Sequence, residues 1–490
     1  MKRIVTTEEW RDMRGLAVPR FQTDYYYAKV AERLLNEILQ TGVCDELGEE
    51  ACYLMAATLT CYFEDVISNF GIWNCFVRKH KEMYGKVLPF YDINEDEYCY
   101  DDINPEDIFF LVWMVSQKTN SRNSFYNPEN PAIISVGCKL YEILYDLFET
   151  TPVNEYISDK YLDRGLFDDI YKLKFVLMDL AESCYLFSLF TDEVIEEFEN
   201  VVDNLGLESG AQKMYAIRSR LAFDCKTGPL RLPVWEWYSM FLQFHGYDKE
   251  SSVVKNIRVV EQQLFQLCEN RKNDCLVFKD IRGSLYNVNK CDFNSLENVQ
   301  LDGTPSCSMS LVEYKGEWYP NGLTSWNNSK DVFNEYVMHI DEKENVELNR
   351  ELRRVNNGYP LMYIKDYGGL SEFFKTNFKV ADNLDIPAEL RDKTYFLLYI
   401  PEKGALNIIP DAARIVKDCN NPYYDAEYAE SNSLYMLTSE NTTSNEMLHY
   451  LIENRMMPDM SINSVRGVKR GKQLLQENMD FLARFMRKWY

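Results

Sequence analysis

The spacing of apolar residues changes once along this chain, near residue 272, and this change limits the possible folds more than any other feature. Before it, apolar residues recur every three or four positions, which is typical of amphipathic helices. Tyr27, Val30, Leu34 and Ile38 follow this spacing in the first such stretch. We therefore expect helices from about residue 23 to about residue 271.

Seven stretches carry this helical pattern. They are residues 23–42, 45–68, 104–117, 131–148, 167–190, 233–244 and 251–270. Asn104-Pro105 is a suitable start for the third stretch, because proline fits the first turn of a helix. Several of the stretches are apolar on more than one face, which predicts helices that are packed on several sides within a bundle.

After residue 272, short apolar runs alternate with turn sequences. Arg282-Gly283, Lys315-Gly316 and Pro401–Gly404 each lie between two such runs, which is typical of β-hairpins. Helical stretches intervene near residues 330–340, 368–374 and 444–455. We predict an α+β fold, with a mainly α-helical N-terminal half and a mixed, mostly antiparallel α+β C-terminal half.

The predicted boundary divides an acidic all-α domain, residues 1–272, from an α+β domain, residues 273–490. The second domain is expected to end in one amphipathic helix over residues 465–489, because Leu474, Phe481, Phe485 and Trp489 share one helical face. Basic residues surround this face, and we expect them to meet acidic groups elsewhere in the protein.

The charge of the chain excludes one class of partner. The sequence has 53 lysines and arginines against 77 aspartates and glutamates, a net charge of −24. Residues 1–200 contribute 18 basic and 37 acidic side chains. Because such a surface repels phosphate backbones, we expect no nucleic-acid partner. A protein or peptide partner with cationic character fits the charge better.

Cysteine usage and hydropathy indicate the compartment. No stretch is long and apolar enough to span a membrane, and the N-terminus does not resemble a secretory signal. The thirteen cysteines include no C-x-x-C pair. We therefore predict a cytoplasmic protein without a membrane partner and with its thiols reduced.

Metal and cofactor motifs are not found in the sequence. The acidic run over residues 92–107 has Glu97 and Ile103 where an EF-hand loop needs glycine and glutamate. The four histidines fit no zinc module, and nucleotide-binding glycine motifs are missing. We expect no metal site and no bound cofactor.

One catalytic pattern is present. Cys225, Gly228 and Arg231 satisfy C-x-x-G-x-x-R, the spacing of the phosphate-binding loop in cysteine-dependent phosphatases. In that chemistry a thiolate attacks phosphorus while an arginine binds the phosphate oxygens. Two departures weigh against it. Asp224 precedes the cysteine and would raise the thiol pKa, and Leu232 stands where a hydroxyl residue is usual.

Two regions resemble a known family. They read YFEDVISNFGIWNCFVRKHKEMYGKVLPFY with INPEDI, within residues 62–108, and PDAARIVKDCNNPYYD with LLQENMDFLARF, within residues 410–485. Together they are similar to a family of uncharacterised bacterial proteins that share a domain of unknown function. The resemblance implies a bacterial cytoplasmic protein, and it brings no activity, cofactor or catalytic residue.

These observations favour a non-enzymatic binding or interaction protein. The alternative is a cysteine-dependent phosphatase in which Cys225 is the nucleophile and Arg231 binds the phosphate.

Overall fold

A computed structural model describes residues 3–120, 125–203, 210–270, 275–290, 293, 305–327, 332–338, 346–378, 388–440 and 442–490. The chain forms two compact units, Met1–Lys330 and Asp331–Tyr490, and each is described here by itself. The boundary predicted between residues 272 and 273 lies outside the described residues and stays a prediction.

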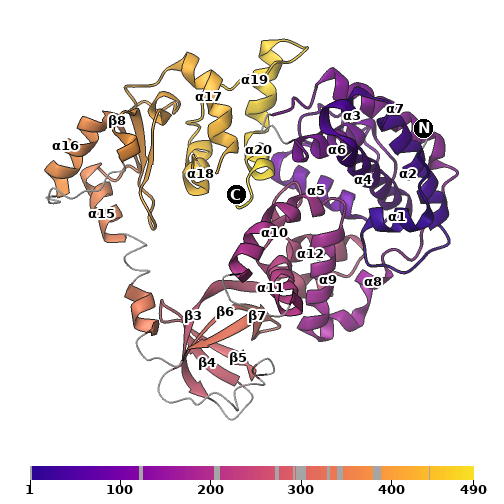
Figure 1. Ribbon diagram of the computed structural model, residues 1–490, viewed down its shortest axis with the longest axis horizontal. Coiled ribbons are helices and arrows are strands. Elements are labelled where there is room, and N and C mark those ends of the chain that lie inside the picture. Colours follow the sequence, from indigo (N-terminus) through magenta and orange to yellow (C-terminus); the bar gives the residue numbers. More distant parts are fainter. Residues whose placement is uncertain are drawn as a thin grey trace. The chain divides into compact units, whose positions relative to one another are not determined.

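The first unit begins with helices, as the apolar spacing predicted (Figure 1). They are α1 (Thr7–Arg14), α2 (Asp24–Ile38), α3 (Gly42–Leu47), α4 (Glu49–Ser68), α5 (Ile72–Tyr84), α6 (Pro105–Lys118), α7 (Pro131–Phe148), α8 (Asp159–Leu162), η1 (Arg164–Asp168), α9 (Ile170–Ser183), α10 (Ser188–Asp203), α11 (Gly210–Phe223), α12 (Val234–Phe244) and α13 (Asp248–Lys255). Helices α4 and α6 are buried on most sides and form the centre of the core.

A closed five-stranded barrel completes this unit. Its strands are β3 (Arg258–Asn270), β4 (Cys275–Lys279), β5 (Leu285–Asn289), β6 (Ser306–Tyr314) and β7 (Glu317–Asn327), in the order β3-β4-β5-β7-β6. All neighbours are antiparallel except β5 and β7. Phe265, Leu276, Phe278 and Met309 are among the side chains that fill its interior.

The predicted hairpins of this barrel are confirmed. Strands β4 and β5 enclose Gly283, which has a φ of 85°. Strands β6 and β7 are joined at Lys315 and Gly316, with φ values of 52° and 84°. Positive φ at both central residues is what a tight two-residue hairpin requires, because it matches the twist of the two strands.

The helix predicted over residues 251–270 is only partly correct. Helix α13 ends at Lys255, and the longest strand of the barrel, β3, starts at Arg258. Phe265 and Leu267, two residues apart, both point into the barrel core. The β-branched and aromatic residues of this segment favour a strand, and burial inside the barrel decides between the two patterns.

The second unit contains a three-stranded antiparallel sheet in the order β10-β9-β8. Its described elements are a helix over residues 332–338, α15 (Val346–Val355), β8 (Leu361–Asp366), α16 (Tyr367–Phe378), η4 (Ala388–Leu390), β9 (Thr394–Tyr399), β10 (Asn407–Ile409), η5 (Ala412–Arg414), α17 (Ala426–Thr438), α18 (Asn445–Glu453), α19 (Val468–Glu477) and α20 (Met479–Met486). Leu352, Leu370, Phe396 and Leu398 lie in the core between the sheet and its helices.

The single C-terminal helix predicted over residues 465–489 is two helices, α19 and α20. They are separated at Asn478, which is buried and donates from Nδ2 to the carbonyl of Leu474 at 2.7 Å. Three of the four residues of the predicted apolar face are packed, since Leu474, Phe481 and Phe485 are buried. The fourth, Trp489, lies beyond the end of α20 and is 36% exposed. With a helical half and a mixed half, the protein is α+β, as the sequence indicates.

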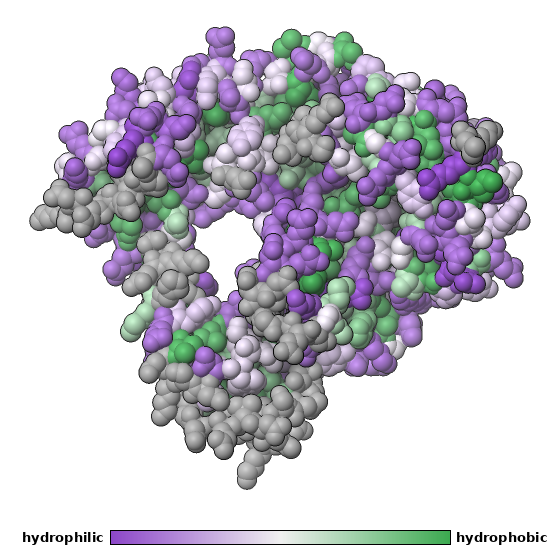
Figure 2. Space-filling model, in the orientation of Figure 1, coloured by the Kyte–Doolittle hydropathy of each residue, from purple (hydrophilic) through white to green (hydrophobic). Residues whose placement is uncertain are grey.

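Two further features concern the surface and the cysteines. No described helix is both long and apolar enough to cross a membrane. Each of the twelve cysteines that the structure describes is free. On the face shown in Figure 2, hydrophilic residues dominate and hydrophobic ones occur in small groups.

Candidate functional site

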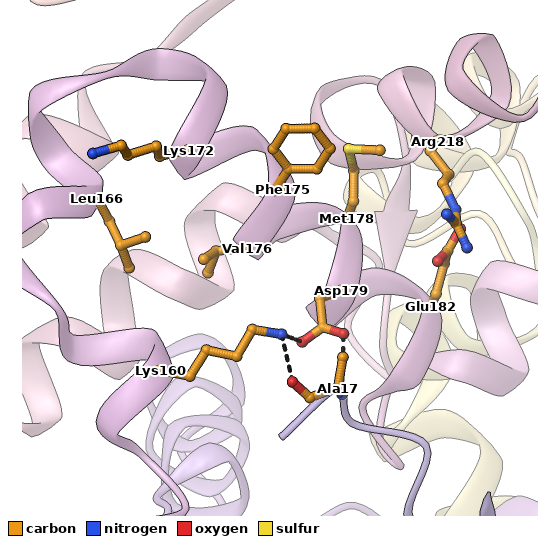
Figure 3. Close-up of a pocket in the computed structure, with 10 residues that line it drawn as sticks. All are labelled: Ala17, Lys160, Leu166, Lys172, Phe175, Val176, Met178, Asp179, Glu182 and Arg218. Atoms are coloured by element: carbon orange, nitrogen blue, oxygen red, sulfur yellow. Dashed lines mark hydrogen bonds and ion pairs between the residues drawn. The ribbon is translucent and has the colours of Figure 1, made fainter. Parts of the chain in front are cut away.

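A hollow of about 490 Å³ opens between α8, η1, α9 and α11 of the first unit (Figure 3). We call it the α9 pocket. Its wall combines five apolar side chains with five charged ones. The lining residues are Ala17, Lys160, Leu166, Lys172, Phe175, Val176, Met178, Asp179, Glu182 and Arg218.

Local sequence signals position the elements that form the pocket. Asp169 caps α9 by accepting from the amide of Tyr171, and Asp163 caps η1 by accepting from the amide of Gly165. Such caps satisfy the free amides at the start of a helix. Two of the elements that form the pocket, η1 and α9, therefore begin at residues that the sequence defines.

The barrel supports two walls of the pocket from behind. Tyr314 Oη and Lys315 Nζ both donate to the carbonyl of Phe167 in η1, at 2.7 and 2.6 Å. Asn321 Nδ2 donates to the carbonyl of Ser219 in α11 at 3.1 Å. These bonds fix η1 and α11 relative to the β6–β7 hairpin.

The apolar side of the pocket is dominated by one exposed ring. Phe175 is 61% exposed, whereas Val176 and Met178 beside it are buried. In Figure 3 the ring lies next to Met178 at the edge of the hollow. An exposed phenylalanine beside a hollow is an apolar surface that a ligand can cover.

The polar floor of the pocket is internally bonded. Asp179 accepts from Lys160 Nζ at 2.7 Å, from Tyr161 Oη at 2.6 Å and from the Ala17 amide at 3.2 Å. Lys160 Nζ also donates to the Ala17 carbonyl at 2.9 Å. Because these groups already satisfy one another, they shape the pocket without needing a ligand.

The rim carries one further ion pair and one additional cation. Arg218 Nε and Glu182 Oε1 are 2.8 Å apart. Lys172 is exposed on the opposite side of the pocket. The charges of the lining residues therefore sum to one positive charge. This charge disfavours a cation in the hollow, whereas the apolar wall favours an apolar group, alone or beside a carboxylate.

The predicted phosphatase residues lie in another part of the first unit. Cys225 directly precedes β1 (Lys226–Thr227), and Arg231 directly precedes β2 (Leu232–Pro233), the second strand of the same small hairpin. The Cys225 thiol is fully buried and lies 3.6 Å from the carbonyl of Lys226. Burial raises the pKa of this thiol to about 12, so that it is protonated at neutral pH.

The Arg231 guanidinium is also buried, and protein groups engage it. Nη1 donates to the carbonyl of Phe190 at 3.1 Å, and Nη2 pairs with the carboxylate of Glu193. The face of the Phe190 ring lies 4.9 Å from the guanidinium carbon. The donors that would bind phosphate in a phosphatase thus hold the hairpin against α10, which favours a structural role.

Sequence reasoning did not find the α9 pocket. The stretch that contains Phe175 is apolar on several faces, and this pattern predicts packing on several sides. The structure shows that Phe175 is exposed instead. The only signal was the excess of apolar residues on α9 over what one buried face needs.

Comparison with known proteins identifies the family. The family described as "Protein of unknown function (DUF3843)" matches residues 7–272 and 321–488, so that the chain belongs to this family. The resemblance seen in the sequence is confirmed. No curated protein and no solved structure matches the chain.

Proposed function

We propose that this member of the DUF3843 family is a non-enzymatic binding protein, and that its α9 pocket takes an apolar side chain of a protein or peptide partner. The observation that carries the proposal is the 61% exposure of Phe175 at the edge of a hollow of about 490 Å³.

Covering Phe175 supplies the driving force for binding. Full burial of a phenylalanine side chain contributes about 1.5–3 kcal/mol, and the partner's own apolar side chain adds a similar amount. Asp179 and Glu182 are already paired with cations in the free protein. The partner therefore does not have to desolvate an unpaired carboxylate when it enters.

The charge of the chain suggests what surrounds the anchoring side chain. Lys172 at the pocket disfavours a cation in the hollow itself. Residues 1–200 as a whole carry 37 acidic against 18 basic side chains. We therefore propose a partner with cationic character, whose basic residues lie beyond the pocket and whose anchor is apolar.

The compartment is part of the proposal. Thirteen cysteines without a C-x-x-C pair fit a reducing environment, and the family resemblance suggests a bacterial source. We propose that the protein acts in the bacterial cytoplasm.

A peptide selection tests this function. The full-length protein would be used to select from a displayed random-peptide library, and the enriched peptides would be titrated calorimetrically. We expect an aromatic or aliphatic anchor in the enriched peptides. The substitution Phe175→Asp should raise their dissociation constants about tenfold or more, which corresponds to about 1.4 kcal/mol.

Tyr145→Asp is the matched control. Tyr145 is also an aromatic residue on a helix of the first unit, and it is also 61% exposed. Its substitution should leave the dissociation constants within about twofold. The proposal fails if no peptide is enriched over an unrelated protein, or if Phe175→Asp and Tyr145→Asp affect binding equally.

A further inference from the structure

A second hollow lies between helices α5 and α12, away from the α9 pocket, and has a volume of about 450 Å³. We call it the α5–α12 hollow. It is lined by residues that recur at helical spacing on each helix, together with the first residue of α13. The lining residues are Cys75, Arg78, Lys79, Glu82, Met240, Gln243, Phe244 and Asp248.

Arg78 is held in this hollow by two aromatic rings. Its guanidinium carbon lies 5.7 Å from the ring centre of Tyr100 and 5.3 Å from that of Phe244. Stacking on rings orients a guanidinium while leaving the donors at its edge available. The side chain is exposed, and it makes no hydrogen bond and no ion pair with the described residues.

Phe244 is itself fixed in place. Its ring fills the space where a side chain at position 71 would lie, since a Cβ on Gly71 would be 2.3 Å from the ring. The next residue, His245, is anchored through Nε2 to the carbonyl of Phe70 at 3.0 Å. Arg78 therefore stacks on a platform that is defined before any ligand binds.

An acidic side chain, that of Asp248, also lines the α5–α12 hollow. Asp248 is the first residue of α13, and its negative charge lies at the positive end of the helix dipole. Its side chain is exposed and makes no ion pair within the described part of the chain. Lys79, in contrast, is already paired with Glu82 at 3.3 Å and Glu236 at 3.5 Å.

The α5–α12 hollow thus presents one available guanidinium, one available carboxylate and an apolar wall. Arginine binds carboxylates through two parallel hydrogen bonds, and a carboxylate binds an ammonium group. Met240 and Phe244 offer a surface for an apolar body. Neither charge is paired with a described residue, and two charges of opposite sign that face one hollow favour a ligand that carries both charges.

We propose that the α5–α12 hollow binds a small zwitterion of the amino-acid class, with its carboxylate on Arg78, its ammonium group near Asp248 and its side chain on Met240 and Phe244. The Gln243 amide, which also lines the hollow, can donate to the carboxylate. This proposal does not depend on the α9 pocket.

The test uses ligands that differ by one charged group. L-Leucine would be titrated calorimetrically into the full-length protein, beside 4-methylpentanoate, which lacks the ammonium group, and isopentylamine, which lacks the carboxylate. L-Phenylalanine, β-alanine and γ-aminobutyrate would vary the side chain and the distance between the charges. We expect at least one zwitterion to bind about tenfold or more tightly than either single-charge analogue.

Two substitutions assign the charges. Arg78→Met should weaken the binding of that zwitterion about tenfold or more, and Asp248→Asn should do the same. Arg33→Met changes another exposed arginine, on α2, and should leave the affinity unchanged. Melting curves would show that all variants are folded.

Three results would overturn the proposal. The first is that no zwitterion of the panel binds at concentrations up to about 10 mM, the range in which weak specific ligands are still measurable. The second is that 4-methylpentanoate or inorganic phosphate binds as well as the best zwitterion, which would make the hollow a simple anion site. The third is that Arg78→Met leaves the affinity of that zwitterion unchanged.

Discussion

At the scale of single residues, two aspartates in the helical core of the first unit have a pKa above the usual range of a carboxyl group. Asp107 is fully buried and accepts from Tyr62 Oη at 2.7 Å, Tyr98 Oη at 2.9 Å and Asn104 Nδ2 at 3.2 Å. Burial raises its pKa to about 7, and it raises the pKa of Asp65 to about 6. The hydrogen bonds offset only part of the cost of desolvating the charge.

This burial predicts a pH dependence of stability. The folded protein holds the Asp107 proton more tightly than the unfolded chain, where the pKa is about 3.9, so that unfolding between these two values releases a proton. The free energy of unfolding should therefore fall as the pH rises from about 5 to about 8, by about 2–3 kcal/mol through Asp107. Urea unfolding at the two pH values measures this loss.

The substitution Asp107→Asn should remove the part of the decrease in unfolding free energy that comes from Asp107, because an amide does not titrate. Asp12→Asn, which changes an exposed aspartate of α1, should leave the loss as in the wild type. An equal pH dependence of Asp107→Asn and the wild type would show that Asp107 is ionised throughout this range.

At the scale of elements, one arginine joins the ends of two helices in the second unit. Arg487 follows α20 and is fully buried. It donates to the carbonyls of Met436, Leu437 and Ser439 at the end of α17. It also donates to the Thr443 carbonyl and to Asn445 Oδ1 at the start of α18. The last carbonyls of α17 therefore depend on a residue about fifty positions later.

Replacing Arg487 should loosen both helices. Arg487→Ala leaves several buried acceptors without a donor, and each costs about 1–3 kcal/mol. We expect amide hydrogen exchange in α17 and α18 to become about a hundredfold faster, which corresponds to about 3 kcal/mol. Mass spectrometry of peptides from residues 426–453 would measure this.

Lys469→Ala, which changes an exposed cation of α19, should leave this exchange unchanged. If Arg487→Ala also leaves it unchanged, then other groups or water satisfy the carbonyls of α17, and Arg487 is not what holds these helix ends.

Helices and hairpins were predictable from the sequence where a residue's own conformational preference matches the element that forms there. Pro105 begins α6, and Gly283 and Gly316 mark the two hairpins of the barrel. In these places the backbone conformation depends on the residue itself. The C-x-x-G-x-x-R match did not indicate the surroundings of Cys225 and Arg231, because three residue types at fixed spacing do not determine what packs around them. In the structure Glu193, from another helix, engages Arg231.

Elements and sites that depend on distant neighbours were not predictable. The helical pattern before residue 270 did not show that β6 would pair with β3 and draw it into a barrel. The C-terminal pattern did not show the break at Asn478, whose carboxamide bonds to the preceding turn. The exposure of Phe175 depends on which helices pack on α9, and the stacking of Arg78 depends on the position of Phe244. Apolar spacing carries none of this information.

At the scale of the whole molecule, the net charge of −24 should govern how fast a basic partner arrives. Attraction over long distances raises association rates, and salt screens it beyond about 10 Å at 0.1 M. The association rate constants of basic peptides selected on the α9 pocket should therefore fall about tenfold or more between about 50 and 500 mM sodium chloride.

Stopped-flow fluorescence with labelled peptides would measure these rate constants. A peptide with the same anchor, but with its basic residues replaced by acidic ones, serves as the control and should associate faster as salt is added. Association rates of the basic peptides that do not change with salt would contradict a partner with cationic character.

The closure of the barrel also determines when the first unit can finish folding. Phe265 in β3 pairs with Cys307 in β6, and Val288 in β5 pairs with Trp318 in β7, so that both contacts join segments far apart in the chain. Hairpins such as β6–β7 close quickly, whereas pairings across long loops form late and slow the overall rate. During synthesis on the ribosome, the edge of β3 that pairs with β6 therefore stays unpaired until β6 has been made. Tyr314 and Asn321, which hold η1 and α11, belong to the β6–β7 hairpin, and this hairpin is synthesised after both helices. The α9 pocket therefore becomes complete only after β6 and β7 have been made.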